Sequence, residues 1–134
     1  MENIEVEGNI ILTVSEDRLE KDQNIKIEYT AEISCLVPEE RKEPVEKDEL
    51  INDFFKAVEE VFGKAGENRY SPRSIMMPSL SKEIAIADKM NIKWMNEKGI
   101  EIFSVYFLKY QICEEDREKI KAALQPRPEE FLFR

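Results

Sequence analysis

A long run of alternating apolar and polar residues, from Ile25 to Val37, constrains the fold more than any other feature of the sequence. Successive side chains of a β-strand point to opposite faces of a sheet, so the alternation predicts a strand with one face on a core and the other in water. Pro38 ends the run, because proline has no backbone N–H to give to a sheet. The side chains assigned to the core face are Ile25, Ile27, Tyr29, Ala31, Ile33, Cys35 and Val37.

Two further segments have the spacing of β-strands. Residues 9–15 alternate over a shorter length, and a charged turn over residues 16–24 joins them to the long strand. Residues 100–112 carry apolar side chains on both faces, which is typical of a strand that is covered on both sides. We therefore predict that residues 100–112 form the central strand of the sheet.

Apolar residues at helical spacing predict a helix over residues 49–65. Asp48 is its predicted N-cap, and Gly63 and Gly66 supply the stop. A short third helix is predicted over residues 114–124, with acidic residues first and basic residues later, the order that suits the helix dipole.

A second long helix is predicted over residues 79–98. Ser79 or Ser81 is its N-cap, and Gly99 is the left-handed residue that closes it. The residues predicted to share its buried face are Leu80, Ile84, Ala87, Asn91 and Trp94 or Met95.

Together these elements predict an α+β fold, in which a mixed or antiparallel sheet packs on one layer of helices. A chain of 134 residues fits one domain, residues 1–134. Its last part, residues 125–134, is expected to be a tail interrupted by prolines.

The formal net charge of −9 narrows the partners that the protein can have. Nucleic acids and anionic lipid surfaces attract basic patches, and the sequence shows none, so we expect protein partners and no nucleic acid. No stretch approaches the roughly 18 apolar residues that a membrane helix needs, and the N-terminus lacks the layout of a signal peptide. These features predict a cytoplasmic protein with no direct membrane span.

The absence of histidine removes the usual general base and the commonest metal ligand. The four glycines never form a loop that could bring backbone amides onto a phosphate. We therefore predict no catalytic residue, no cofactor and no metal. The acidic run Glu114, Glu115, Asp116 and Glu118 is expected to stabilise a helix N-terminus rather than to hold Ca²⁺.

The two cysteines, Cys35 and Cys113, are expected to be reduced apolar residues. An enzyme that uses carboxylates or a cysteine stays open as an alternative. It would require that one of these thiols have a lowered pKa.

Two apolar segments are candidates for contacts with other proteins. Met76 and Met77 lie in a connection between prolines, where soft side chains can form an adaptable surface or can fold under the second helix. In the tail, Phe131, Leu132 and Phe133 either dock back on the domain or add to a neighbouring chain.

From Leu50 to Leu124 the sequence resembles a known family. The helix LINDFFKAVEEVFGKAG is followed by a connector with Tyr70, a helix ending in KWMNEK, the segment GIEIFSV and an acidic helix start. This layout is similar to the SPFH domain of stomatins, prohibitins and flotillins, and most like its bacterial virion-core-like branch, with a W-x-x-x-x-G-I-E-(I/V)-x-S segment. The resemblance covers roughly the last 75 residues.

The resemblance implies a noncatalytic domain that assembles side by side with copies of itself, as a scaffold for other proteins near a membrane. The hydrophobic anchor of the membrane-bound members is missing here, so membrane association is expected only through partners. The expected function is thus a self-associating scaffold or adaptor that forms homo-oligomers. A small module that binds a protein or peptide is the alternative, through the Met76–Met77 connector or a free sheet edge.

Overall fold

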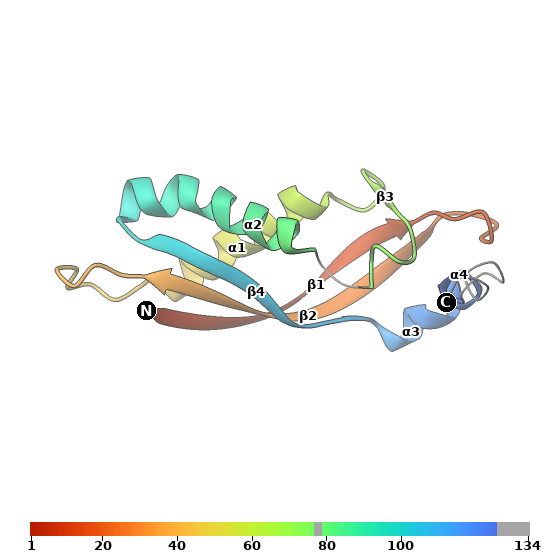
Figure 1. Cartoon of the computed structure of the whole chain (residues 1–134), viewed down its shortest axis with the longest axis horizontal. Helices are drawn as coiled ribbons and strands as arrows, with labels where there is room; N and C mark the ends of the chain where they lie inside the picture. Colours follow the sequence, from red (N-terminus) through yellow and green to blue (C-terminus); the bar gives the residue numbers. More distant parts are fainter. Residues whose placement is uncertain (77–78, 126–134) are drawn as a thin grey trace, which may run out of the picture.

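The protein has an α+β fold, with a four-stranded mixed sheet covered on one face by helices (Figure 1). The computed structural model describes residues 1–76 and 79–125. The strands are β1 (Glu2–Val14), β2 (Gln23–Leu36), β3 (Arg69–Tyr70) and β4 (Glu101–Ile112), and the long helices are α1 (Lys47–Phe62) and α2 (Leu80–Lys93). A π-helical turn, η1 (Trp94–Lys98), extends α2, and three short helical pieces follow β4: α3 (Glu114–Arg117), η2 (Glu118–Ile120) and α4 (Lys121–Leu124).

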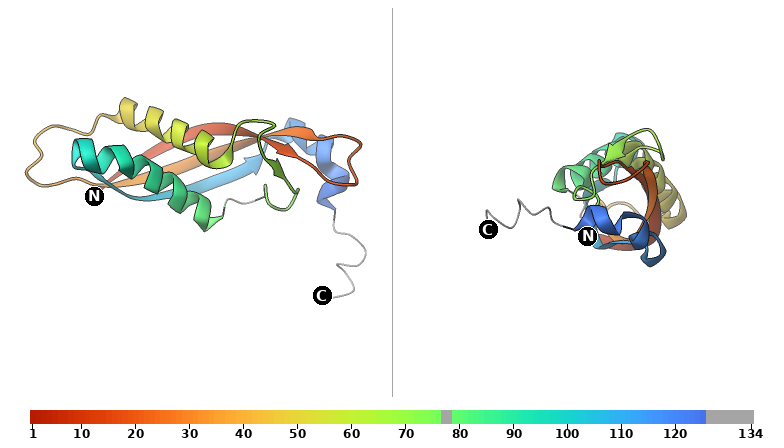
Figure 2. Two further views of the ribbon diagram at one scale, coloured as in Figure 1. Left: turned by 90° about the horizontal axis from the view of Figure 1, so that it is seen from above. Right: turned by 90° about the vertical axis from the view of Figure 1, so that its right-hand side faces the viewer.

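The strand order is β3-β1-β2-β4. β1 and β2 form a long antiparallel hairpin, β4 adds to β2 in antiparallel direction, and β3 pairs with β1 in parallel over two positions only. Seen from above, α1 lies along β1 and α2 lies along β4, side by side on the same face of the sheet (Figure 2). The predicted class, with one layer of helices on a sheet, is confirmed.

The core lies between the sheet and the two long helices. The predicted inward side chains of β2 are buried, and only Val37, beyond the end of the strand, is partly exposed. The helices add their own apolar side chains to the same cluster, chiefly Leu50, Phe54, Val58, Phe62, Ile86, Met90 and Trp94.

The prediction that residues 100–112 form the central strand is wrong. β4 lies at the edge of the sheet, and β2 is its only strand neighbour among the described residues. The register of β4 against β2 shifts twice, so that Phe103 and Leu108 are extra residues without an opposite partner. Each such bulge reverses the alternation. A strand with one buried face therefore shows apolar residues at both parities in its sequence.

The predicted buried face of α2 is also wrong at its N-terminal half. Leu80 is 70% exposed and Ile84 is 52% exposed, whereas Ala87 is buried as predicted and the helix buries Glu83, Ile86 and Met90 beside it. The rotation of α2 about its own axis is set by two hydrogen bonds near its C-terminal end. Trp94 donates to Asp53 of α1, and Asn91 donates to the Ile102 carbonyl oxygen of β4.

The predicted helix boundaries are met in part. Ser79 is the N-cap of α2 and accepts a hydrogen bond from the Lys82 N–H, and Gly99 closes η1 with a left-handed φ of 68°. At α1 the prediction fails, because Glu46 rather than Asp48 holds the N-cap position and no side chain caps this end.

Candidate functional site

Most of the large exposed apolar side chains among the described residues come from α2, η1, β4 and the segment before α2. Besides Met1, Ile11, Leu36 and Phe55, those of the described residues are Met76, Leu80, Ile84, Ile92, Met95, Phe103, Tyr106 and Leu108. The second group comes from α2, η1, β4 and the segment before α2. Contiguous apolar surface on a folded domain marks a site of contact with another molecule.

Two polar side chains of α2 attach the helix to the outer edge of β4. The Asn91 amide donates to the Ile102 carbonyl oxygen over 3.0 Å and accepts from the Ile102 N–H over 2.7 Å. About two turns earlier in α2, the buried Glu83 carboxylate accepts from the Phe107 N–H over 2.8 Å. The two side chains thus form hydrogen bonds with N–H and C=O groups at the outer edge of β4 that would otherwise be free to pair with another strand.

Five exposed apolar residues of α2, η1 and β4 are together called the α2–β4 seam: Leu80, Ile84, Met95, Phe103 and Leu108. Leu80, Ile84 and Met95 stand at helical spacing from Asn91, so they share the side of α2 that meets β4. The two bulged residues Phe103 and Leu108 directly follow Ile102 and Phe107, the positions held by Asn91 and Glu83. All five side chains are exposed.

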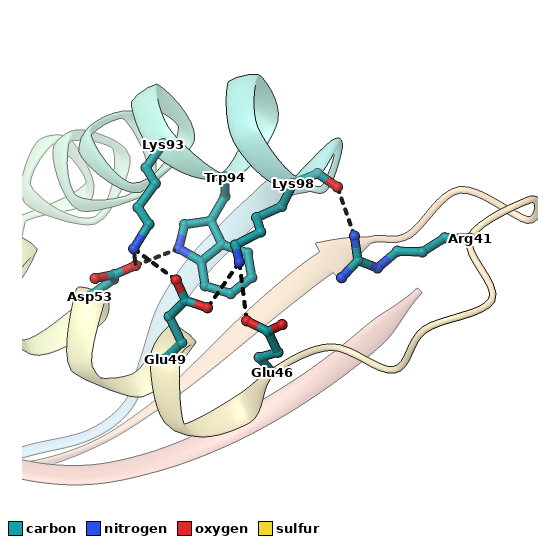
Figure 3. A network of polar contacts seen from close by, with 7 residues as sticks. All are labelled: Arg41, Glu46, Glu49, Asp53, Lys93, Trp94 and Lys98. Atoms are coloured by element: carbon teal, nitrogen blue, oxygen red, sulfur yellow. Dashed lines mark hydrogen bonds and ion pairs between the residues drawn. The ribbon is translucent and has the colours of Figure 1, made fainter.

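A polar network holds α2 and η1 against α1 beside this seam (Figure 3). The Trp94 indole is fully buried and donates to the Asp53 carboxylate over 2.9 Å. The Lys93 ammonium lies 2.9 Å from both Asp53 and Glu49. Lys98 bridges Glu49 and Glu46 at 3.1 Å each, and its carbonyl oxygen accepts from the Arg41 guanidinium.

The network shifts the titration of its members. Hydrogen bonding with Glu46, and with the Lys93 and Lys98 ammonium groups, lowers the pKa of Glu49 to about 2. Hydrogen bonds to Asp53 and Glu49 raise the pKa of Lys93. The charges therefore stabilise one another at neutral pH, and they fix the position of the helix that carries the seam.

The structure places one of the predicted contact residues. Met76 is 49% exposed at the end of the segment that leads to α2. Met77, Phe131, Leu132 and Phe133 lie outside the described residues. Sequence reasoning missed the seam because Leu80 and Ile84 were assigned to the core. A signal was present, since α2 has apolar residues over more of its circumference than one buried face requires.

The cysteines and the acidic run were the other residues considered for chemistry. Neither cysteine forms a disulfide. Burial, with the Glu2 charge, raises the pKa of the Cys35 thiol to about 11, so this thiol is a poor nucleophile at neutral pH. In the acidic run after β4, Asp116 accepts the Lys26 N–H over 2.7 Å and pairs with Lys119. The Lys26 backbone bond, followed by Lys119, lowers the pKa of Asp116.

Neither a membrane-spanning helix nor a metal site is found among the described residues, and comparison with known proteins gives no match. No helix in the described ranges combines the length and apolar character needed to cross a bilayer. Residues 1–76 and 79–125 contain no group of three or more cysteine, aspartate or glutamate side chains arranged to hold a metal ion. No protein family, curated protein or solved structure matches the chain.

Proposed function

We propose that this chain is a noncatalytic scaffold or adaptor domain of the SPFH type that associates with copies of itself, with any membrane contact made through partners. The observation that carries the proposal is the exposed α2–β4 seam. The sequence resemblance supports it, because the residues that carry the resemblance include α2, η1 and β4, the elements that build the seam.

Burial of the seam supplies the driving force for association. Moving one fully exposed leucine or isoleucine side chain out of water contributes about 1.5–3 kcal/mol. Burial of several such side chains offsets the free-energy cost of bringing two chains together, which is at least about 4 kcal/mol. Because Asn91 and Glu83 occupy the adjacent edge of β4, the copies are expected to meet through side chains rather than through a shared sheet.

Light scattering across a protein concentration series tests the proposal. The wild type should rise above the monomer mass of 15.8 kDa as concentration increases. The double variant Ile84→Glu with Met95→Glu, which places two charges in the seam, should stay monomeric. Ile92→Glu is the matched control, since Ile92 is also an exposed isoleucine of α2 but is not one of the five seam residues. A wild-type mass that stays at 15.8 kDa throughout would remove the proposal.

A further inference from the structure

The outer edge of β1 is open along most of its length. β3 pairs only with Thr13 and Val14, and no strand in the described part of the chain lies beside residues 3–11 on that side. This edge is the side of β1 that faces away from β2 and β4, so it is separate from the α2–β4 seam.

The register identifies which backbone groups point outwards. The Lys26 carbonyl oxygen accepts from Cys113 on the β4 side, so the even residues of β2 face β4 and the odd ones face β1. Because Ile4 pairs with Ile33 and Val6 with Ala31, the even residues of β1 face β2. The N–H and C=O groups of Asn3, Glu5, Glu7, Asn9 and Ile11 therefore point to the open edge. The Ser15 N–H agrees with this parity, because it donates to Tyr70 on the β3 side.

A hollow of about 380 Å³ lies between β1 and α1, next to this edge. Ile10, Phe55 and Val58 give it an apolar lining, with Glu59 and Lys64 also at its wall. Tyr29 lines it as well, is only 3% exposed, and its hydroxyl has no hydrogen-bond partner among the described residues.

Gly8 keeps room for that hydroxyl under the edge. A Cβ atom at Gly8 would lie 2.5 Å from the Tyr29 hydroxyl oxygen. Burial raises the pKa of Tyr29 to about 12, so the group stays protonated and keeps its donor at neutral pH. The β1 edge thus combines open backbone groups, an apolar hollow and an unused hydroxyl.

The other face of the edge is acidic. Glu5 and Glu7 are exposed there, and Glu5 stands directly opposite Glu32 of β2. Like charges that face each other across a strand pair are unfavourable. Neither Glu5, Glu7 nor Glu32 has a cationic partner among the described residues. A strand with basic side chains on this face would relieve the repulsion.

We propose that β1 takes up an extended segment of a partner protein as an additional strand, and that this segment alternates basic and apolar residues. Its basic side chains lie opposite Glu5 and Glu7, its backbone pairs with the odd residues of β1, and an apolar side chain enters the hollow between β1 and α1. A basic segment is favoured over other partners because its charge complements the acidic face of β1.

Fluorescence anisotropy with labelled peptides tests the proposal on the full chain. The probe is a fluorescein-labelled peptide that alternates lysine with valine and has one central leucine. One comparison peptide replaces the lysines by glutamates, and a second has the probe's composition with its lysines grouped together. Titrations use the seam variant Ile84→Glu with Met95→Glu, so that binding is measured whether or not copies associate through the seam.

The alternating lysine peptide should bind at least about tenfold more tightly than either comparison peptide, a difference of about 1.4 kcal/mol. Asn9→Pro removes an outward N–H without touching the β1–β2 ladder and should weaken binding about tenfold, whereas Asn9→Thr should not. Glu5→Lys with Glu7→Lys, two exposed changes that leave the core intact, should reverse the preference towards the glutamate peptide.

Three results would overturn the proposal. The first is no binding, or equal binding of the alternating and grouped lysine peptides, which means attraction by charge alone. The second is equal affinity of folded Asn9→Pro and Asn9→Thr, together with an unchanged preference in the Glu5→Lys, Glu7→Lys variant. The third is a dimer of the seam variant that Asn9→Pro dissociates, because the edge is then occupied by a second copy of this chain.

Discussion

At the scale of single residues, Trp94 connects the last turn of α2 to α1. Its ring is buried in the core, and its N–H reaches the same Asp53 oxygen that pairs with the Lys93 ammonium. The indole therefore contributes both apolar burial and a charge-assisted hydrogen bond, which is the stronger kind. The position of α2, and with it the seam, depends on this residue.

Trp94→Phe is expected to destabilise the fold by about 1–3 kcal/mol, because it removes the hydrogen bond and part of the packed ring. Urea unfolding measures the loss. A double-mutant cycle with Asp53→Asn isolates the bond, with an expected coupling of about 1 kcal/mol. Additive effects of the two changes would mean that the indole acts by packing alone.

Acid should weaken the same network through Glu49. Its pKa falls from 4.5 to about 2 in the folded protein, so the folded state favours the charged carboxylate. Such a group contributes stability that is fully present above pH 4.5 and is lost as pH falls towards 2. Urea midpoints of the wild type should therefore drop steeply across this window, and those of Glu49→Gln should drop less. Parallel pH profiles of the two proteins would contradict the assignment.

At the scale of elements, the sequence predicted those parts of the fold in which a regular pattern runs unbroken. The inward face of β2 follows strict alternation and is confirmed, as is the Gly99 stop, and of the two predicted caps, Ser79 and Ser81, the structure has Ser79. β4 was misplaced because the bulges at Phe103 and Leu108 change the parity, and a sequence does not show which residue lacks a partner. The rotation of α2 depends on contacts of Asn91 and Glu83 with a strand further along the chain.

The outer edge of β4 is expected to be protected by Asn91. Asn91→Leu removes both hydrogen bonds to Ile102 and leaves its N–H and C=O open to other chains. We expect faster aggregation, followed by thioflavin T fluorescence on mild heating. Asn91→Asp keeps the acceptor for the Ile102 N–H and loses the donor, so it should aggregate at an intermediate rate. Equal rates for all three proteins would show that the amide does not guard the edge.

At the scale of the whole molecule, the sequence predicts a surface for contacts with other proteins, and the structure offers the seam as a candidate for it. A negative charge, no histidine and no clustered glycines pointed to a protein that works through its surface. The sequence indicated the Met76–Met77 connector, the tail residues 131–133 or a free sheet edge and not the seam, because an exposed apolar residue on an amphipathic helix has the same pattern as a buried one. Only the packing of α2 between α1 and β4 separates Ile84, which is exposed, from Ile86, which is buried.

The net charge of −9 makes a prediction about salt, because each copy of the chain repels the next. Association through an apolar seam should strengthen as salt screens this repulsion, whereas capture of a basic strand by Glu5 and Glu7 should weaken. Light scattering of the wild type and peptide anisotropy of the seam variant, each measured over the same salt series, should therefore change in opposite directions. Self-association that falls with added salt would mean that ion pairs hold the copies together, and the seam would lose its role. Peptide binding that is indifferent to salt would remove the acidic face of β1 from recognition and leave only the open backbone edge and the apolar hollow.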